Sequence, residues 1–233
     1  MAEAYYVPTR VRLTRSLLRS TFRLIFHALS RVKITGKKNV PPTGAYLIAF
    51  NHVSLFEPPL ICAFWPVAPE AMGAVEIWGR PLQSLLARWY GGIPVHRNQF
   101  DRQLIETTLN VLRSGYPLVI APEGERSHTP GMQPAQRGVA YLMDKARVPV
   151  VPVGVVGNSE DFLDRALHGE RPLIEMRIGR PLIFSSADTL AMSRRAARQH
   201  NTDAVMTQIA ALLPPDYRGV YSSYIGDNEK TYQ

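Results

Sequence analysis

The chain has 233 residues, of which 45% are hydrophobic, and this is enough for one core of ordinary size, so we expect a single domain. A single cysteine excludes a disulfide framework and favours a reducing compartment. The formal net charge is +8, and we expect neither a secretory signal nor a transmembrane helix, because no apolar segment of the required length is present.

The charge imbalance is confined to the N-terminal segment. Residues 1–40 contain nine basic residues and one acidic residue, whereas the rest of the chain carries 18 of each and is neutral. The nine basic residues are Arg10, Arg12, Arg15, Arg19, Arg23, Arg31, Lys33, Lys37 and Lys38. Because the remainder has no basic excess that would continue a nucleic-acid footprint, we expect no nucleic-acid partner.

An amphipathic helix is predicted over residues 10–30. Apolar residues recur there at spacings of three, four and seven, and Arg12, Arg15, Arg19 and Arg23 form a separate basic stripe. A basic stripe beside a broad apolar face predicts a helix that lies in the headgroup layer of an anionic membrane, with its arginines on lipid phosphates. The alternative is a helix packed on the rest of the protein with a solvated basic face.

After residue 40, short apolar runs alternate with helical patterns. Strands are predicted at 45–50, 71–75, 118–121, 150–156 and 173–178. Helices are predicted at 60–64, 81–90, 102–112, 135–147 and 202–213, and the tail after 217 is polar. This alternation predicts an α/β fold, a single domain in which helices flank a mixed, mostly parallel sheet and the amphipathic basic helix precedes it.

The segment 51–59 directly follows the first predicted strand. Ligands of α/β sheets bind beyond the carboxyl ends of the strands, and His52 falls there. Glu57, five residues later, can fold back and accept a hydrogen bond from the imidazole, which fixes its tautomer and stabilises the imidazolium. The other ring nitrogen is then free to take a proton from a hydroxyl group, which becomes the nucleophile.

Glu57 also has a purely structural interpretation. Ser54-x-x-Glu57 matches a capping box, in which the glutamate only caps a helix. That register would put Pro58 and Pro59 at the fourth and fifth helical positions, where backbone N–H groups are needed. Pro58 suits the first helical position better, so the prolines argue against the capping box.

Three further segments combine apolar runs with glycine, proline or charged residues. In 91–97, glycines allow the backbone to approach a ligand closely, and Arg97 can bind phosphate. After the third predicted strand, Glu123 can accept from a hydroxyl group and Arg126 can pair with phosphate. The run 148–154 is interrupted by prolines, which predicts a strand at a sheet edge or a wall beside a ligand. The structural alternatives are surface turns and an ordinary strand.

Together, the four segments resemble the glycerolipid acyltransferase family, whose members are often called lysophospholipid acyltransferases. The family's first block, Asn-His-x-Ser-x-x-Asp, is matched by Asn51-His52-Val53-Ser54-Leu55-Phe56-Glu57. Its third, Glu-Gly-Thr-Arg-Ser, is matched by Glu123-Gly124-Glu125-Arg126-Ser127. The arginine of its second block and the central proline of its fourth are matched by Arg97 and Pro152, and the resemblance runs from about residue 36 to residue 179.

The resemblance implies a membrane-associated enzyme that moves a fatty acyl group from a thioester onto a hydroxyl of a lysophospholipid such as 1-acylglycerol-3-phosphate. His52 is implied as general base and Glu57 as its orienting carboxylate. Arg97 and Arg126 are implied to bind the acceptor phosphate, and Glu123 to position its glycerol part. The implied substrate-binding residues are Arg97, Glu123, Gly124, Arg126, Ser127 and Pro152.

The resemblance also sets expectations for partners and location. The donor is acyl-CoA or acyl carrier protein, and no cofactor or metal is expected, since the sequence has no His-Glu-x-x-His and no clustered cysteines. We expect peripheral or monotopic attachment to the cytoplasmic face of an anionic membrane. The expected division is a membrane-surface helix (1–35), an acyltransferase domain (36–217) and a polar tail (218–233).

Two residues depart from the family's pattern. Glu57 replaces an aspartate, and Glu125 replaces a neutral threonine beside the implied phosphate site. The alternatives are therefore an acyltransferase of the same fold with another lipid acceptor, or a non-catalytic lipid-binding relative. Other enzyme classes are disfavoured because the sequence lacks Gly-x-Ser-x-Gly, Gly-x4-Gly-Lys and Gly-x-Gly-x-x-Gly.

Overall fold

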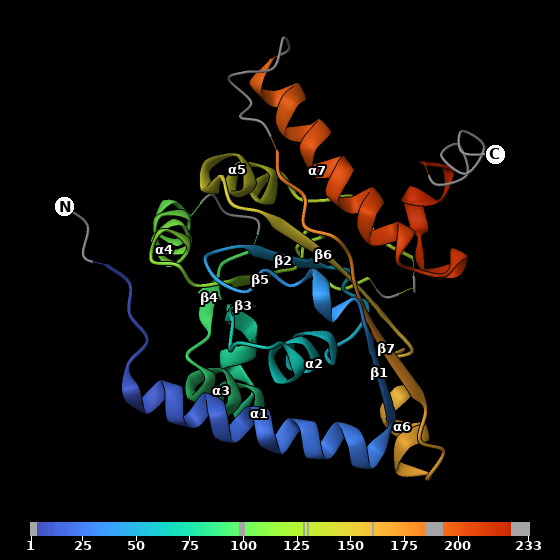
Figure 1. The fold of residues 1–233 in the computed structure, drawn as a ribbon. Helices are drawn as coiled ribbons and strands as arrows, with labels where there is room; N and C mark the ends of the chain where they lie inside the picture. The colour runs from blue at the N-terminus through green and yellow to red at the C-terminus, as the bar shows by residue number, and fades with distance from the viewer. Residues whose placement is uncertain are drawn as a thin grey trace.

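The computed structural model describes residues 4–97, 101–127, 129, 131–159, 161–184 and 193–224, without the side chains of 137 and 138. Within them a seven-stranded sheet has the order β1-β7-β6-β2-β5-β3-β4 (Figure 1). The strands are β1 (Arg31–Thr35), β2 (Leu47–Phe50), β3 (Glu70–Ala74), β4 (Ile93–Val95), β5 (Leu118–Ile120), β6 (Val150–Val156) and β7 (Leu173–Ile178). Neighbours run parallel except β6 and β7, which confirms the predicted α/β fold class.

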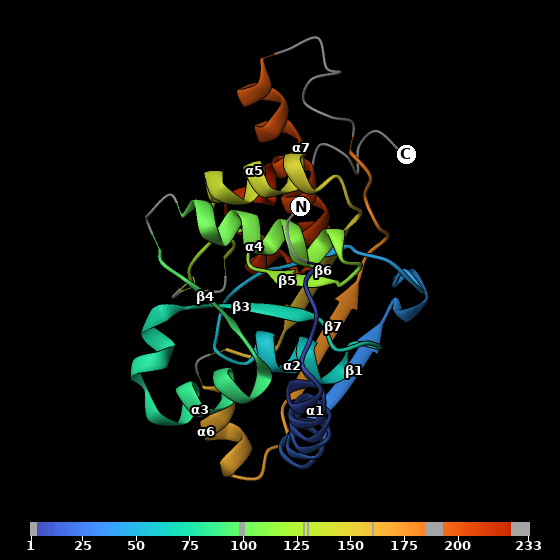
Figure 2. The same cartoon turned by 90° about the vertical axis from the view of Figure 1, so that its left-hand side faces the viewer.

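Helices cover both faces of the sheet, with α4, α5 and α7 on one side and α1, α2 and α3 on the other (Figures 1 and 2). Their bounds are α1 (Thr9–Leu29), α2 (Glu57–Phe64), α3 (Pro81–Tyr90), α4 (Arg102–Arg113), α5 (Arg137–Ala146), α6 (Phe162–Leu167) and α7 (Arg194–Ala211). Short 3-10 turns lie at Lys37–Asn39, Val75–Gly79, Pro215–Tyr217 and Gly219–Tyr221. None of the described helices is long and apolar enough to cross a bilayer.

The two hydrophobic cores follow from the alternation of side chains along the strands. In β2, Leu47 and Ala49 pack into the core under α4, α5 and α7, whereas Ile48 and Phe50 pack into the core on the other face. All four residues are at most 2% exposed. A parallel sheet covered by helices on both faces requires such continuous apolar runs, and this is why the strand was recognisable in the sequence.

The N-terminal helix α1 packs against α2 and α3, and three arginines of its predicted basic stripe bind groups of the domain. Arg15 is 3% exposed and forms a bidentate ion pair with Glu70, the first residue of β3. Arg19 donates to the carbonyl oxygens of Cys62 and Trp65, and Arg23 donates to that of Ala63. The prediction that the stripe lies on lipid phosphates is therefore wrong for the buried Arg15, whereas Arg12 and Arg23 remain exposed.

The physical reason is that α2 ends beside α1. The last carbonyl groups of a helix have no partner within it and carry partial negative charge, so cations close to them are stabilising. The guanidinium groups of Arg19 and Arg23 supply donors to this end of α2. The sequence shows the basic stripe, but the partners of Arg15, Arg19 and Arg23 are 40–75 residues away along the chain.

The segments predicted to flank the domain are continuous with it. Residues 31–35 form β1, which pairs with β7 at one edge of the sheet. At the other end of the chain, the described part of the predicted tail packs on the domain. Tyr221 is 4% exposed, and the N–H of Val220 donates to the carbonyl of Met132 at 3.2 Å.

Pro152 lies in a strand interior to the sheet, so the edge position predicted for its strand is wrong. β6 pairs with β2 on one side and with β7 on the other. The sheet tolerates the missing N–H because β7 ends at Ile178, and opposite Pro152 stands Gly179, which donates its own N–H to the Pro152 carbonyl at 2.8 Å. A Cβ on Gly179 would come within 2.8 Å of the proline ring, which explains the glycine.

Candidate active site

Three loops meet where β2, β5 and β6 end. β2 runs parallel to both β5 and β6, so the carboxyl ends of all three strands lie at one edge of the sheet. His52 follows the end of β2 by two residues, Asn158 follows β6 by two, and Glu123 follows β5 by three. This edge is where α/β sheets place ligands.

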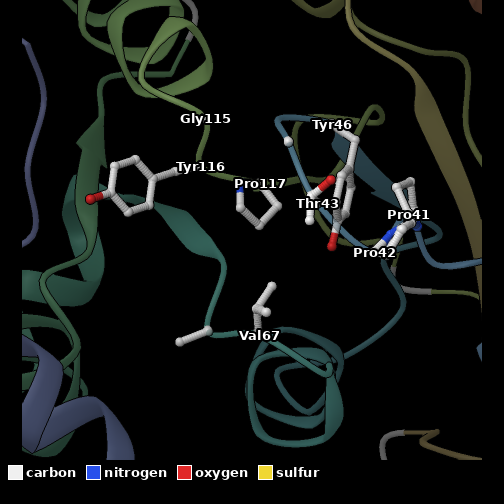
Figure 3. A pocket seen from close by; sticks show the side chains of 10 residues that line it. Pro41, Pro42, Thr43, Tyr46, Val67, Gly115, Tyr116 and Pro117 are labelled. Carbon is white, nitrogen blue, oxygen red and sulfur yellow. The ribbon is translucent and has the colours of Figure 1, made fainter.

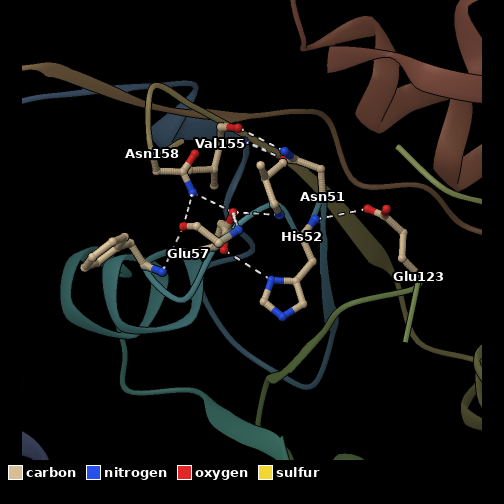
Figure 4. Close-up of polar contacts among 9 residues, drawn as sticks. Asn51, His52, Glu57, Glu123, Val155 and Asn158 are labelled. Atoms are coloured by element: carbon tan, nitrogen blue, oxygen red, sulfur yellow. Dashed lines mark hydrogen bonds and ion pairs between the residues drawn. The ribbon is translucent and has the colours of Figure 1, made fainter. Parts of the chain in front are cut away.

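His52 and Glu57 form the central pair of this site (Figure 4). The Nδ1 atom of His52 lies 3.1 Å from Oε2 of Glu57. The Glu57 side chain is fully buried, while that of His52 remains 13% exposed. No hydrogen bond of Nε2 is found among the described residues, and the ring turns this nitrogen away from Glu57. With Nδ1–H donating to the carboxylate, Nε2 carries the lone pair that can accept a proton.

The second oxygen of Glu57 is held by N–H donors. Oε1 accepts from the backbone N–H groups of Val53 and Ser54, each at 2.8 Å, and from the amide of Asn158 at 2.5 Å. The bond from the Ser54 N–H to the Glu57 carboxylate is one half of a capping box. The other half is missing, because the Ser54 hydroxyl accepts from the N–H of Phe56 and not from the N–H of Glu57. Glu57 is the first residue of α2, so its carboxylate both binds the loop before the helix and faces His52.

Glu123 and Ser127 fix the backbone of His52. The His52 N–H donates to Oε1 of Glu123 at 3.0 Å, and the Ser127 N–H donates to the His52 carbonyl at 2.8 Å. The other Glu123 oxygen accepts from the N–H of Gln133 at 2.8 Å. Burial raises the pKa of Glu123 to about 7, against the lowering effect of these two backbone donors.

The surroundings of Glu123 bear on its predicted role. Its side chain is 1% exposed, and both oxygens already accept backbone N–H bonds. Such a carboxylate holds the histidine loop, and its contact with a glycerol hydroxyl stays a prediction. The neighbouring Gly124 has a φ of +77°, and a Cβ there would approach the Gln136 side chain to 2.5 Å, so this turn requires glycine.

The remaining predicted residues lie at different distances from the pair. Ser127 is buried, and its hydroxyl lies within hydrogen-bonding distance of the carbonyl oxygens of Thr129 and Gly131, to either of which its one proton can be donated. Arg126 is partly exposed on the same loop. Arg97 is exposed and follows β4, which is three strands from β2, or about 14 Å at the usual strand spacing. Pro152 is buried in β6 opposite Ala49, inside the sheet.

Two buried asparagines complete the site. Asn51 belongs to the segment Asn51–Glu57. Its side-chain amide donates to the Val155 carbonyl and accepts from the Val155 N–H, which joins β2 to β6 beyond the last paired residues of the two strands. Asn158 was not identified as a candidate. Its position directly after a predicted strand, like that of His52, was the available signal. Its contact with Glu57, which is 101 residues away along the chain, could not be read from the sequence.

One cavity lies away from this site (Figure 3). It has a volume of about 280 Å³ and is lined by residues that precede β2 and β5. These include Pro41, Tyr46, Tyr116 and Pro117, so the cavity is at the amino ends of the strands, on the opposite edge from His52. The described residues contain no cluster of three His, Cys, Asp or Glu side chains that could hold a metal ion.

Comparisons with known proteins identify relatives over much of the chain. The family described as Acyltransferase matches residues 31–156, more than half of the chain. Mouse 1-acyl-sn-glycerol-3-phosphate acyltransferase alpha is 29% identical over 143 residues, which are 58% of this chain and 48% of that protein. The human protein of the same name is 29% identical over 140 residues, which are 57% of this chain and 47% of that protein.

A solved structure extends the likeness to the fold. The 1-acyl-sn-glycerophosphate (LPA) acyltransferase PlsC from Thermotoga maritima superposes with a TM-score of 0.60 at 18% sequence identity, covering 84% of this chain and 79% of that one. The chain spans about half the length of the curated relatives that it matches. The matched region contains the whole group from Asn51 to Ser127 and all of β6, and the chain belongs to the acyltransferase family.

Proposed function

We propose that this protein transfers a fatty acyl group from a thioester donor, acyl-CoA or acyl carrier protein, to a hydroxyl of a lysophospholipid such as 1-acylglycerol-3-phosphate. The observation that carries this proposal is the His52–Glu57 pair at the carboxyl edge of the sheet, with Nε2 of His52 free to take a proton. The names of the mouse and human relatives support this choice of acceptor.

The proposed reaction is a direct transfer. Nε2 of His52 takes the proton of the acceptor hydroxyl as its oxygen attacks the thioester carbonyl carbon. Glu57 accepts from Nδ1–H and stabilises the imidazolium that forms. The tetrahedral intermediate then collapses, the carbon–sulfur bond breaks, and the imidazolium returns its proton to the leaving thiolate. The products are the ester and the free thiol, and the protein ends in its starting protonation state.

The decisive experiment measures thiol release by the purified protein from acyl-CoA and from acyl carrier protein thioester, with and without lysophosphatidate. Release that requires the acceptor, together with the diacyl product detected by mass, supports transfer. Release without acceptor would indicate a thioesterase. Absence of release with a panel of lysophospholipids would instead leave a lipid-binding protein. A panel that includes lipids without phosphate also tests whether the Glu125 departure changes the acceptor.

We propose that Arg97 and Arg126 bind the acceptor phosphate, because both lie beyond the carboxyl ends of parallel strands at the same edge as His52. Arg97→Ala and Arg126→Ala are each expected to lower kcat/KM for the acceptor. The expected loss of transition-state stabilisation is about 1.5–3 kcal/mol per arginine, the scale of a hydrogen bond to a charged group. The KM for the donor is expected to change less. Arg113→Ala, an exposed arginine at the end of α4, is the control. A larger effect on the donor KM would assign the arginines to the other substrate.

We propose that the protein attaches peripherally to the cytoplasmic face of a membrane through apolar side chains of α1. Leu13, Leu17 and Leu24 are 67%, 61% and 72% exposed, and α3, which packs against α1, exposes Leu82 and Trp89. Several basic residues near α1 remain exposed and suit anionic headgroups. These are Arg10, Arg12, Arg23, Arg31, Lys33, Lys37 and Lys38.

Changing Leu13, Leu17 and Leu24 together to glutamine is expected to reduce flotation with anionic vesicles at least about tenfold, since burying one leucine side chain stabilises by about 1.5–3 kcal/mol. This variant is preferable to deleting α1, because deletion would also leave Glu70 buried without Arg15. Glutamine at the exposed Ile183 and Val220 is the control. Flotation that the triple change leaves intact would refute attachment through α1.

A further inference from the structure

The amide of Asn158 lies against the carboxylate that faces His52. Its Nδ2 is 2.5 Å from Oε1 of Glu57 and 3.0 Å from the hydroxyl oxygen of Ser54. Asn158 and Glu57 are both fully buried. Figure 4 shows the amide pointing at Glu57 from the loop after β6, on the side of the carboxylate away from the His52 ring.

We propose that Asn158 is a positioning residue for the catalytic pair, which holds Glu57 so that its second oxygen stays on Nδ1 of His52. This inference rests on the proposed function, in which His52 acts as the base. Asn158 does not touch the reacting atoms. It acts through Glu57, and its removal is expected to lower turnover without weakening the binding of either substrate.

The argument begins with the freedom of the Glu57 side chain. A glutamate carboxylate can rotate about its last bond, and both of its oxygens accept equally well, so it must be restrained for one oxygen to stay on the histidine. The N–H groups of Val53 and Ser54 provide part of this restraint. Both belong to the loop that also carries His52, so they move together with the histidine. The Asn158 amide comes from the loop directly after β6 and ties the carboxylate to the end of that strand.

The orientation of the amide follows from its partner. An ionised carboxylate can only accept, so the Asn158 group that faces Glu57 must be its NH2. The same NH2 reaches the Ser54 hydroxyl oxygen, which also accepts from the N–H of Phe56, just before α2. Asn158 thus joins the histidine loop, the first residue of α2 and the end of β6 at one point. A charge-assisted bond of this kind is about twice as strong as one between neutral groups.

The first test replaces Asn158 with leucine, which nearly preserves the volume and removes the amide. We expect Asn158→Leu to lower kcat roughly ten- to a hundredfold, the scale of one lost charge-assisted hydrogen bond, with both KM values within about twofold. Thr108→Val is the control, because Thr108 is equally buried but its hydroxyl bonds only within α4. Should Asn158→Leu not fold, Asn158→Ser, which is too short to reach Glu57, replaces it with the same expectation.

The decisive test combines Asn158→Leu with Glu57→Gln. If Asn158 acts through Glu57, the two residues act as a unit. The double variant is then expected to have a kcat within about twofold of that of Glu57→Gln alone. An equal loss in both backgrounds, or normal kcat in Asn158→Leu alone, would overturn the inference. Full activity of both His52→Ala and Glu57→Gln would instead overturn the proposed function. Low activity of those two variants beside a normal Asn158→Leu would refute the positioning role alone.

Discussion

His52→Ala is expected to leave a folded protein whose kcat is lower by at least about a hundredfold, the usual lower scale for loss of a general base. The expected loss lies in kcat because Nε2 acts on the proton that moves in the transition state. Thiol release with saturating donor and acceptor measures it. The loop is held through the backbone N–H and carbonyl of His52, and both of these bonds can persist in the variant, so we expect the fold to survive the loss of the imidazole.

The matched control is His200→Ala, an exposed histidine of α7 on the other face of the sheet. It should retain wild-type turnover. Normal turnover in His52→Ala would show that no proton transfer passes through this ring, and it would favour a lipid-binding protein if no thioester is consumed at all.

Glu57→Gln is expected to lower kcat by at least about a hundredfold while the Tm shifts by less than about 4 °C, equivalent to about 1 kcal/mol in a domain of this size. The structure gives the reason. Val53, Ser54 and Asn158 all donate to Oε1, so the amide oxygen of glutamine must stay there and its NH2 must face Nδ1 of His52. Nδ1 then has to accept, the ring proton moves to Nε2, and the base is lost.

The same substitution separates the two interpretations of Glu57. If Glu57 only binds the N–H groups before α2, glutamine would serve nearly as well in that role, and turnover would stay near normal. Glu57→Asp is expected to retain part of the activity, because aspartate is the usual residue of the family, although it is one methylene shorter. Near-normal turnover in Glu57→Gln beside an inactive His52→Ala would show that the histidine works without this partner.

The sequence by itself determined the layered α/β architecture and the candidate pair. Apolar runs predict strands that are buried on both faces, and the ranges 150–156 and 173–178 agree with β6 and β7 to the residue. Such patterns are local, as is the separation of five residues between His52 and Glu57. The prolines at 58 and 59 likewise indicated that α2 begins near Glu57, and the structure has it begin there.

Short or mixed elements escaped the sequence reading. β1 alternates charged and apolar residues over five positions beside a basic helix, and β4 has only three residues. α6 has six residues, too few to show a helical period. The start of α7 at Arg194, eight residues before its predicted start, lies in a polar stretch whose apolar face is visible only from Ala197 onward. In each case pairing or packing with distant segments stabilises the element.

Only the tertiary structure decided what the polar side chains contact. A stripe of arginines on a helix has the same sequence pattern whether it faces lipid phosphates, a buried glutamate or the end of another helix. The choice depended on Glu70 and on the last carbonyl groups of α2. Glu123 and Asn158 likewise acquire their roles from His52 and Glu57, 71 and 101 residues away. A buried polar group must find a partner, but which partner it finds is set by strand order, and strand order is a property of the whole chain.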